Sequence, residues 1–587
     1  MALATVLKGG RQRMSDITLT IDGRTVHAAP GSTILEAARG AGIRIPTLCW
    51  HEDLGTPSAC RVCVVEIAGM RTLQPACSYP ASQGIVVRTN SPIVREARRM
   101  AVELILAHHP DDCLSCARNL RCELQQLASD LGIREIRFER VKRGLPRDES
   151  SPSIVRDPDK CINCRRCVEA CEKIQGVAAL SVINRGFDAV VMPAYEDGLM
   201  DAVCVMCGQC TLACPTGAII ERDDTARVWE ALSDPDRHVV VQTAPAIRAS
   251  LGEELGLPAG SIVTGKMAAA LRRLGFDRVF DTDFSADVTI MEEGHELLQR
   301  LGSGGTLPLI TSCSPGWIKF IEHFYPELLP HVSTCKSPQQ MFGALAKTYY
   351  AERAGIDPAK MFVVSIMPCT AKKFEVQRPE MRASGRQDVD VALTTRELGR
   401  MLREAGIDLD DSPEEDFDAP LGISTGAAAI FGATGGVMEA ALRTVYEVVT
   451  GRELPPESLE FHDVRGLQGV KETTVTLNGN CVNVAVAHGL ANARRVLDRI
   501  RSGQAPWQFV EIMCCPGGCV GGGGQPIGTV MNTRAERAGA LYAADRDMEL
   551  RSSHKNPAVA TLYEEYLERP LSKRSHELLH THYTPRR

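Results

Sequence analysis

Cysteine is the residue type that stands out in this sequence, with 22 copies in a chain of 587 residues. Fifteen of them lie within the first 214 residues, mostly two to five residues from the next. Disulfides between such close neighbours would be strained, and disulfide scaffolds are usually much smaller than this chain. Thiolates at the same spacing can converge on one soft metal centre. The spacing therefore predicts iron–sulfur clusters, with structural zinc as the weaker alternative.

Two runs give the strongest signal, because each reads C-x2-C-x2-C-x3-C. Proline follows the second run, as in bacterial two-cluster ferredoxins, where the fourth cysteine of each run binds the other cluster. We expect one 4Fe–4S cluster on Cys161, Cys164, Cys167 and Cys214. We expect a second on Cys204, Cys207, Cys210 and Cys171.

Two further groups of potential ligands precede these runs. The first has C-x10-C-x2-C-x13-C spacing and comprises Cys49, Cys60, Cys63 and Cys77. The second has H-x3-C-x2-C-x5-C spacing and comprises His109, Cys113, Cys116 and Cys122. Spacing alone leaves zinc and an iron–sulfur cluster both open for this second group. The first 225 residues therefore predict an electron relay, which many enzymes could use.

Three more cysteine motifs lie in the last two-thirds of the chain. They read TSCSPGW from Thr311, MPCTAKK from Met367 and MCCPGGC from Met513. Apolar runs precede each motif, so each can occupy a loop at a strand end, where open α/β sheets place active sites. The glycines at 521–524 lack the lysine of a P-loop, and we expect them to let the backbone approach a bulky group closely.

The elements that must position these residues can be read from the hydrophobic pattern. Residues 17–27 alternate around Asp22-Gly23, which predicts a hairpin, and Ser32-Thr33 predicts the start of a helix. Beyond His238, short apolar runs alternate with helical patterns, which predicts an α/β domain. The expected strands are 238–241, 279–281, 307–310 and 361–366, and the clearest helix is 261–275. The charged stretch between Arg222 and His238 predicts a linker.

Composition and charge exclude several classes of protein. The chain is 44% hydrophobic and 24% charged, as globular proteins usually are. Its net charge is 66 minus 73, or −7, which makes nucleic acid a poor partner. No apolar run reaches the ~18 residues that span a membrane. Residues 1–14 lack an export-signal core of about 7 apolar residues, so we expect a soluble, cytoplasmic protein.

The N-terminal region resembles a family of electron-transfer subunits. The hairpin, helix and first cysteine group are similar to the 2Fe–2S domain of the large iron–sulfur subunit of NADH dehydrogenase (complex I) and of large hydrogenases. The same resemblance favours a His-ligated 4Fe–4S cluster over zinc at His109, whose neutral ring should shift the cluster potential. His108 is expected to be a surface or packing histidine.

The three later motifs, in this order, closely resemble those of the iron-only (FeFe) hydrogenases, and the match runs from about Asp16 to Tyr583. It is especially similar to the catalytic subunit of multimeric NADP-reducing and electron-bifurcating hydrogenases. The resemblance implies an H-cluster: a 4Fe–4S cube joined to a di-iron unit with CO, cyanide and azadithiolate ligands. It implies reversible H2 oxidation, with electrons leaving through one 2Fe–2S and three 4Fe–4S clusters. The implied partners are a flavin- and NAD(P)-binding subunit and a small 2Fe–2S subunit in a hetero-oligomer, with ferredoxin a further candidate.

The resemblance also implies roles for single residues. Cys369, Cys515 and Cys519 match ligands of the cube, and Cys519 matches the thiolate that bridges to the di-iron unit. Lys372 matches the cation that hydrogen-bonds a cyanide, whose charge it should stabilise. The residues that match the pocket wall are Pro245, Gln339, Met367, Phe431 and Met513.

A proton pathway is implied in the same way. Cys313 matches the proton-relay thiol, and a cysteine suits this role because its ordinary pKa of about 8.5 is near neutrality. Glu293, Glu296 and Arg300 are spaced to share one helix face, and with Ser333 they match the family's pathway to the surface. Without the motifs, this pattern would indicate only a solvated charged face.

One position departs from the family pattern. Ser314 stands where the family has a cysteine ligand of the cube, and its oxygen is a harder donor than a thiolate. Ser314 itself could bind as an alkoxide, or Cys514 could supply the missing thiolate. In a third, less favoured alternative, Cys313 becomes the ligand and the proton pathway loses its first carrier. The same departure keeps open a hydrogen-sensing or low-activity hydrogenase-like protein. Two further alternatives fit less well, because an iron–sulfur assembly relative would lack the full proton path and the long accessory region, and a complex I-like subunit would lack the three later motifs.

The remaining features carry weaker expectations. Cys335 and Cys481 are expected to be buried, inert thiols. The charged, helical chain after about Ala535 resembles the family's small-subunit domain, and its histidines are expected to be structural because no cysteine accompanies them. The predicted fold is multidomain, α+β and α/β. Its expected parts are a β-grasp 2Fe–2S domain at 15–92, a His/Cys3 4Fe–4S domain at 93–148, a two-cluster ferredoxin domain at 149–225, an α/β H-cluster domain at 236–535 and a helical small-subunit-like segment at 536–587.

Overall fold

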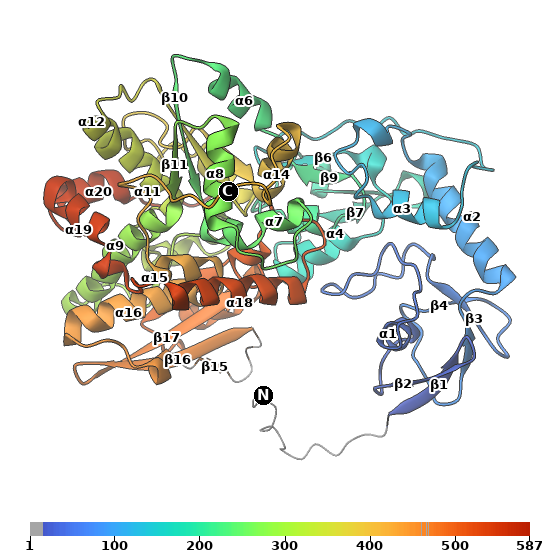
Figure 1. The fold of residues 1–587 in the computed structure, drawn as a ribbon. Coiled ribbons are helices and arrows are strands. Elements are labelled where there is room, and N and C mark those ends of the chain that lie inside the picture. Colours follow the sequence, from blue (N-terminus) through green and yellow to red (C-terminus); the bar gives the residue numbers. More distant parts are fainter. Residues whose placement is uncertain (1–15, 460, 465–466, 468, 587) are drawn as a thin grey trace.

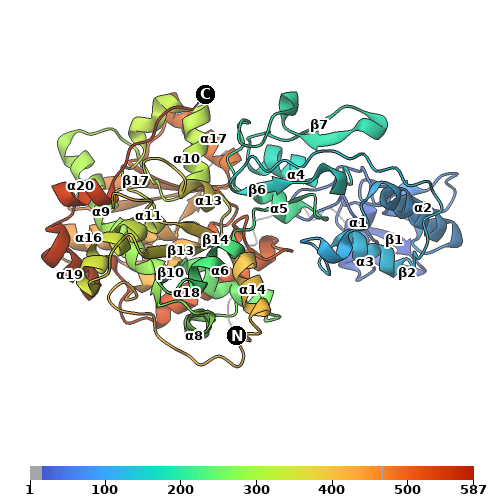
Figure 2. The ribbon, with the colours of Figure 1, turned by 90° about the horizontal axis from the view of Figure 1, so that it is seen from above.

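The computed structural model describes residues 16–586 except 460, 465, 466 and 468. Residues 1–15, on which the expectation about export rests, lie outside the described residues, as does Arg587. Three small N-terminal regions lie on one side of a large α/β body (Figures 1 and 2). Within the described part of the chain, no helix combines the length and apolar character that crossing a bilayer requires.

The first region is a five-stranded sheet in the order β2-β1-β5-β3-β4, with a helix against it. The predicted hairpin is present as β1 (Ile17–Ile21) and β2 (Arg24–Ala28). Helix α1 (Ile34–Gly40) begins where expected, because the Thr33 side chain accepts from the Glu36 N–H while the Glu36 side chain accepts from the Thr33 N–H. The other strands are β3 (Val64–Ile67), β4 (Gln74–Pro75) and β5 (Val86–Arg88).

The next two regions have little regular structure, because their loops are shaped around cysteines. The second contains α2 (Pro92–His108) and α3 (Glu123–Asp130). The third is held by antiparallel pairing of β6 (Ile154–Arg156) with β9 (Ile219–Glu221) and of β7 (Ser181–Ile183) with β8 (Val190–Met192). Short helices α4 (Arg166–Glu169) and α5 (Gln209–Ala213) carry cysteines of the two runs.

The large body contains two sheets. The first is entirely parallel, in the order β11-β10-β13-β14, and the second has the order β12-β18-β17-β16-β15, with parallel pairing among β12, β18 and β17. Strand β12 ends just before the first of the three motifs, and β13 and β18 end on the first residue of the other two. The strand bounds are β10 (His238–Thr243), β11 (Arg278–Asp281), β12 (Leu309–Ile310), β13 (Met361–Met367), β14 (Val391–Thr394), β15 (His462–Asp463), β16 (Val470–Leu477), β17 (Asn480–His488) and β18 (Phe509–Met513).

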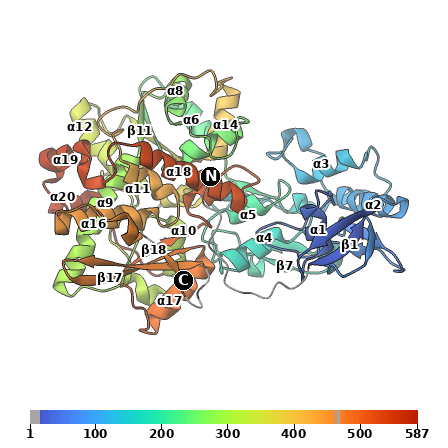
Figure 3. The same ribbon diagram turned by 60° about the horizontal axis from the view of Figure 1, so that its bottom comes forward.

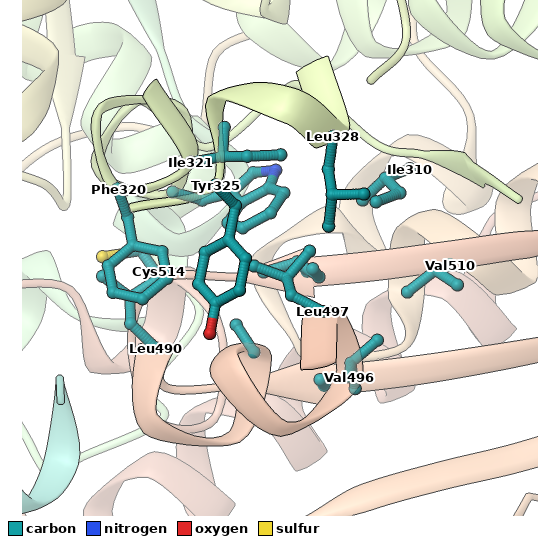
Figure 4. Packing of buried hydrophobic residues seen from close by; sticks show 14 of the residues in the cluster. Ile310, Phe320, Ile321, Tyr325, Leu328, Leu490, Val496, Leu497, Val510 and Cys514 are labelled. Atoms are coloured by element: carbon teal, nitrogen blue, oxygen red, sulfur yellow. The ribbon is translucent and has the colours of Figure 1, made fainter. Parts of the chain in front are cut away.

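Helices pack around these sheets and fix the loops at their ends. The long, largely buried α9 (Thr282–Ser303) packs against α11 (Pro338–Leu345) and α16 (Gly436–Thr450). The predicted helix at 261–275 is α8 (Thr264–Leu274). Figure 4 shows Phe320, Tyr325 and Leu328 of α10 (Pro315–Phe324) and the turn after it packing on side chains of α17 (Leu490–Arg501) and β18. This buried cluster holds the start of α10 against the end of β18.

The predicted linker between Arg222 and His238 is wrong. Residues 225–233 form α6 (Thr225–Ser233), which leads directly into β10. Val228 and Ala231 are fully buried in the core of the first sheet, with Trp229 and Leu232 packed against it. Because its apolar residues are three and four apart, the segment forms a helix with one buried face. The charged residues around them dominate the composition, and the linker prediction rested on that composition.

The C-terminal segment wraps the body as α18 (Met531–Asp547), α19 (Pro557–Leu562) and α20 (Lys573–Leu579). Figure 3 shows α18 running across the body toward α5 of the third region. Arg537 anchors α18, because its fully buried guanidinium donates to both carboxylate oxygens of Glu253 at 2.7 Å and to the Val520 carbonyl oxygen at 2.7 Å.

Arg537→Ala is expected to loosen this anchor. Removing one partner of a buried ion pair leaves the other charge unpaired, which costs about 3 kcal/mol. The midpoint of thermal unfolding of the full chain should fall accordingly. Asn532→Ala on the same helix, at an exposed hydrogen bond to Glu536, is the matched control and should change the stability by less than about 0.5 kcal/mol. Equal unfolding midpoints for the two variants would contradict the assigned role of Arg537.

Candidate active site and its cluster relay

The three later motifs surround one cavity with about 700 Å³ of space not filled by protein atoms. Cys313 and Ser314 reach it from the loop after β12, Cys369 from the loop after β13, and Cys515 and Cys519 from the loop after β18. All three loops lie at the carboxyl ends of parallel strands, as open α/β folds place their sites. The predicted wall residues also line it, and these are Pro245, Gln339, Met367, Phe431 and Met513. Lys372, the predicted cation, lines it as well.

The chemistry of this lining fits an iron–sulfur cluster with a second group beside it. Three thiols of Cys369, Cys515 and Cys519 converge, and burial raises the pKa of Cys369 and Cys519, so binding a soft metal would release their protons. The buried amide oxygen of Gln339 has no hydrogen-bond partner among the described residues. Apart from this oxygen and the Lys372 ammonium group, the wall is largely apolar and offers water few hydrogen-bonding positions.

Glu375 organises the polar side of the cavity. Its Oε2 accepts hydrogen bonds from Lys372 Nζ at 2.9 Å, from Gln339 Nε2 at 2.9 Å and from Ser337 Oγ at 2.8 Å. Lys372 Nζ also donates to the Cys313 carbonyl oxygen at 3.3 Å. The sequence reasoning missed Glu375, although its place three residues after Lys372 in α13 (Ala371–Glu375) was a signal.

Ser314 and Cys514 meet at one corner of the cavity. The backbone N–H of Cys514 donates to Ser314 Oγ at 3.3 Å, and both residues line the cavity. The buried Cys514 thiol lies within hydrogen-bonding reach of the sulfurs of Cys515 and Cys207, which raises its pKa. A Cβ at position 316 would lie 2.7 Å from Cys514 Sγ, so Gly316 leaves the room that this sulfur occupies.

A line of polar groups leads from the cavity along α9. Glu293 is fully buried, and burial raises its pKa to about 8, so its carboxyl group holds a proton at neutral pH. Burial and then the Glu293 charge raise the pKa of the Cys313 thiol. Ser333 Oγ donates to Glu296 Oε2 at 3.1 Å, and Arg300 Nη2 donates to Glu296 Oε1 at 2.6 Å. The five predicted pathway residues thus lie near one another, and the two carboxyl oxygens of Glu293 have no hydrogen-bond partner among the described residues.

The two ferredoxin-type runs form two adjacent cavities. Cys161, Cys164, Cys167 and Cys214 line one of them. Cys171, Cys204, Cys207 and Cys210 line the other, so each cavity takes its fourth cysteine from the other run, as expected. In the glycine-rich segment, Gly522 lines the main cavity, whereas a Cβ at Gly523 would overlap the Cys207 carbonyl oxygen. Gly523 therefore lets the loop after β18 approach the backbone of the loop that carries Cys207.

The first N-terminal group gathers, and in the second group the three cysteines lie near one another. Hydrogen bonds between sulfurs join Cys49 to Cys60 and Cys77, and Cys63 to Cys77. In the second group, His109 Nδ1 lies 3.0 Å from the Pro110 carbonyl oxygen, while its buried Nε2 has no partner among the described residues. That is how a metal-binding histidine is usually oriented.

Contacts between neighbouring groups put them in an order. Cys60 and Cys122 border one buried apolar cluster. A Cβ at Gly217 would lie 2.7 Å from Cys116 Sγ, and Arg118 donates to the Cys214 carbonyl oxygen at 2.8 Å. With the Cys207–Cys514 contact, the groups form a continuous series from the β-grasp region to the main cavity.

One of the weaker expectations needs correction. Cys335 is buried as expected, but Cys481 is exposed on β17, opposite Thr476 in the β16–β17 hairpin. The C-terminal segment has no cysteine of its own, but its His580 forms a β-bridge with Cys335. A contact between residues so far apart in sequence leaves no local pattern.

Comparison with known protein families matches every region of the chain. The C-terminal domain of the iron-only hydrogenase large subunit matches residues 237–523, and the iron hydrogenase small subunit matches 531–586. Upstream, the matches are a 2Fe–2S cluster-binding domain at 14–92, an NADH-ubiquinone oxidoreductase-G iron–sulfur region at 98–137 and a 4Fe–4S dicluster domain at 160–218.

Individual relatives extend this match. The NADP-reducing hydrogenase subunit HndD of Solidesulfovibrio fructosivorans is 54% identical over 586 residues, covering 98% of this chain and 100% of the relative. Iron hydrogenase 1 of Clostridium pasteurianum is 40% identical over 96% of this chain and 99% of its own. The solved structure of apo HydA1, an [FeFe]-hydrogenase from Chlamydomonas reinhardtii, is 45% identical with a TM-score of 0.56, covering 62% of this chain and 99% of that one. The chain belongs to the iron-only (FeFe) hydrogenase family.

Proposed function

We propose that the chain catalyses H2 ⇌ 2H⁺ + 2e⁻ as the catalytic subunit of a larger, NADP-linked complex. The observation that carries this is the meeting of three thiols, Lys372 and a protonatable line of residues at one buried cavity that also touches the cluster relay. The name of the relative HndD, a subunit of an NADP-reducing hydrogenase, supports the link to partner subunits. The cytoplasmic location stays a prediction.

The residues present fit an H-cluster, which when bound would supply the iron that splits H2 and takes up its electrons. Cys369, Cys515 and Cys519 would hold its cube, with Cys519 at the junction to the di-iron unit. Lys372, oriented by Glu375, would direct its ammonium group at an anionic ligand. The wall of Pro245, Gln339, Met367, Phe431 and Met513 would exclude water.

For proton transfer, we assign the line from Cys313 through Glu293, Ser333 and Glu296 to Arg300. A carboxyl group with a pKa near 8 can both give and accept a proton at neutral pH, which suits a relay. The hydroxyl group of Ser333 can donate to one carboxylate while accepting from another group. Arg300 would hold Glu296 in place at the outer end.

For electron transfer, we assign one 2Fe–2S cluster to Cys49, Cys60, Cys63 and Cys77, and three 4Fe–4S clusters to the other groups. The free Nε2 of His109 supports its role as the fourth ligand beside Cys113, Cys116 and Cys122. The β-grasp region lies at the end of the molecule away from the catalytic body (Figure 2). We therefore place the flavin- and NAD(P)-binding subunit and the small 2Fe–2S subunit at that end, with ferredoxin as an additional acceptor.

The activity can be tested on the matured full chain. We expect H2-dependent reduction of a viologen dye together with H2/D2O exchange. A chain that contains CO and cyanide infrared bands but neither reduces the dye nor exchanges hydrogen would contradict the proposal. Exchange without reduction of the accessory clusters would favour a sensor.

For the fourth ligand of the cube, the observations favour Cys514 over Ser314. A thiolate is the softer donor, and the Cys514 sulfur already lies beside the Cys515 sulfur. Ser314 Oγ is engaged by the Cys514 N–H. Because the two residues share one corner of the cavity, a ligand from either position reaches the same side. We propose that Cys514 replaces the cysteine that this chain lacks at position 314.

A reciprocal exchange tests this assignment. In the full chain reconstituted with iron and sulfide but without the di-iron unit, Cys514→Ala should lose the cube, seen as about four fewer iron atoms per chain and a missing Mössbauer component. Ser314→Ala is the control and should keep it. The double variant Ser314→Cys/Cys514→Ala should restore it. Loss of the cube in Ser314→Ala with retention in Cys514→Ala would show that serine is the ligand.

The protonated state of Glu293 gives a pH-dependent prediction. Folding raises the pKa of this carboxyl group from about 4.5 to about 8 through burial. The folded chain therefore holds a proton that the unfolded chain releases, so this group lowers the stability as the pH rises between these values. The infrared band of the protonated carboxyl group should disappear with a midpoint near pH 8 and be absent in Glu293→Gln. A band already lost at pH 6 would disprove this account.

A further inference from the structure

The C-terminal segment lies directly on the proton line at Glu296. Beyond α20, it runs along the loop after Ser333: the Lys336 N–H donates to the Leu579 carbonyl oxygen at 2.8 Å, and the Thr581 N–H donates to the Thr334 carbonyl oxygen at 2.7 Å. This pairing carries the His580 side chain, which is 4% exposed, into the interior. A histidine is thereby held beside a predicted proton carrier.

An unbroken series of hydrogen bonds joins Glu296 to His580. Thr334 Oγ1 lies 3.1 Å from Glu296 Oε2 and 2.8 Å from His580 Nδ1. A hydroxyl group between these atoms can donate to one and accept from the other, so it can pass a proton in either direction. His580 Nε2 lies 3.1 Å from Glu292 Oε2 on the far side of the ring.

Glu292 sets the state of the ring. Burial alone would raise its pKa, but hydrogen bonds from His580 and from Tyr563 hold the pKa below its ordinary value. The Tyr563 hydroxyl lies 2.6 Å from Glu292 Oε1, and the Leu571 N–H donates to Oε2 at 2.8 Å. Glu292 is therefore ionised and accepts a hydrogen bond from the N–H at His580 Nε2. In the neutral ring, Nδ1 then carries no proton and can accept one from Thr334.

Arg300 and His580 differ in what they can do for Glu296. A guanidinium group keeps its proton at any physiological pH, so Arg300 can hold Glu296 but cannot accept a proton from it. Imidazole is the side chain that ordinarily titrates near neutral pH. The ring of His576 lies 4.3 Å from the ring of His580, centroid to centroid, and His576 is exposed.

We propose that the proton line branches at Glu296 and has a second exit through Thr334 and His580 to solvent at His576. In the outward step, the O–H bond of protonated Glu296 breaks as its proton passes to Thr334 Oγ1. The Thr334 hydroxyl proton passes at the same time to His580 Nδ1. The resulting imidazolium ring then turns away from Thr334, releases one N–H proton to solvent beside His576, and returns as a neutral ring to its hydrogen bonds with Thr334 and Glu292. This exit rests on the proposed hydrogenase function.

The same corner could also be considered as a metal site. Glu296, Cys335 and His580 offer ligand atoms that lie within 4.8 Å of one another. Both nitrogens of His580 are already engaged, by Thr334 and Glu292, and Glu296 accepts from Ser333 and pairs with Arg300. With every polar partner satisfied in the absence of an ion, the contacts favour proton transfer over metal binding.

The test measures how fast the buried Glu293 carboxyl group exchanges its proton with D2O, by stopped-flow infrared spectroscopy on the full chain. Because this readout needs no di-iron unit, it decides the proposal even if the matured chain fails to oxidise H2. His580→Gln keeps hydrogen-bonding groups for Thr334 and Glu292 but cannot carry the proton. Arg300→Met removes the group that holds Glu296 at the first exit, without itself being a proton carrier. With two exits, His580→Gln and Arg300→Met should each slow exchange only a few-fold, whereas the double variant should slow it about tenfold or more.

Controls separate this result from a structural effect. Glu296→Gln, which blocks both branches, should match the double variant, and the exposed His582→Gln should exchange like the unaltered chain. If His580→Gln disturbs folding, His576→Gln tests the outer end of the same branch and should slow exchange in the Arg300→Met background. Unchanged exchange on removing His580 or His576 in that background would overturn the second exit.

Discussion

A cluster bound by thiolates can form only where several sulfurs converge in a space that water does not fill, and the architecture of the catalytic body follows from this constraint. The sulfurs come from loops that are far apart in the chain, so the ends of three parallel strands must be held at fixed positions. The buried cluster of α10, α17 and β18 does this for two of the loops. Glu375 fixes the polar side of the cavity, because it accepts hydrogen bonds from both Lys372 and Gln339.

A cavity that holds a redox centre must exchange electrons and protons, and the structure provides separate routes for them. On one side, Cys514 touches both Cys207 and Cys515, and Gly523 lets the backbone of the two regions approach closely. On the other side, Cys313 faces Glu293, and the polar groups of α9 lead outward. Because the two routes leave in different directions, each can be altered without opening the cavity to water.

The sequence predicted the features that depend on local spacing. The four cysteine groups, the Thr33 helix start and the strands before the three motifs could be predicted because ligation, capping and periodicity involve neighbouring residues. Helix α6 was missed because two small buried residues are hidden among charges. Glu375, the exposure of Cys481 and the contact of His580 with Thr334 depend on tertiary packing, and no pattern around those residues contains that information.

We expect the cavity at the ends of β12, β13 and β18 to hold an iron centre in series with four accessory clusters. Anomalous diffraction at the iron edge from crystals of the matured full chain would locate each iron site. We expect iron at each of the four N-terminal groups, including the one at His109, and in the cavity between Cys369, Cys515 and Cys519. A cavity without iron in crystals whose accessory groups are filled, or zinc in place of iron at His109, would contradict this expectation.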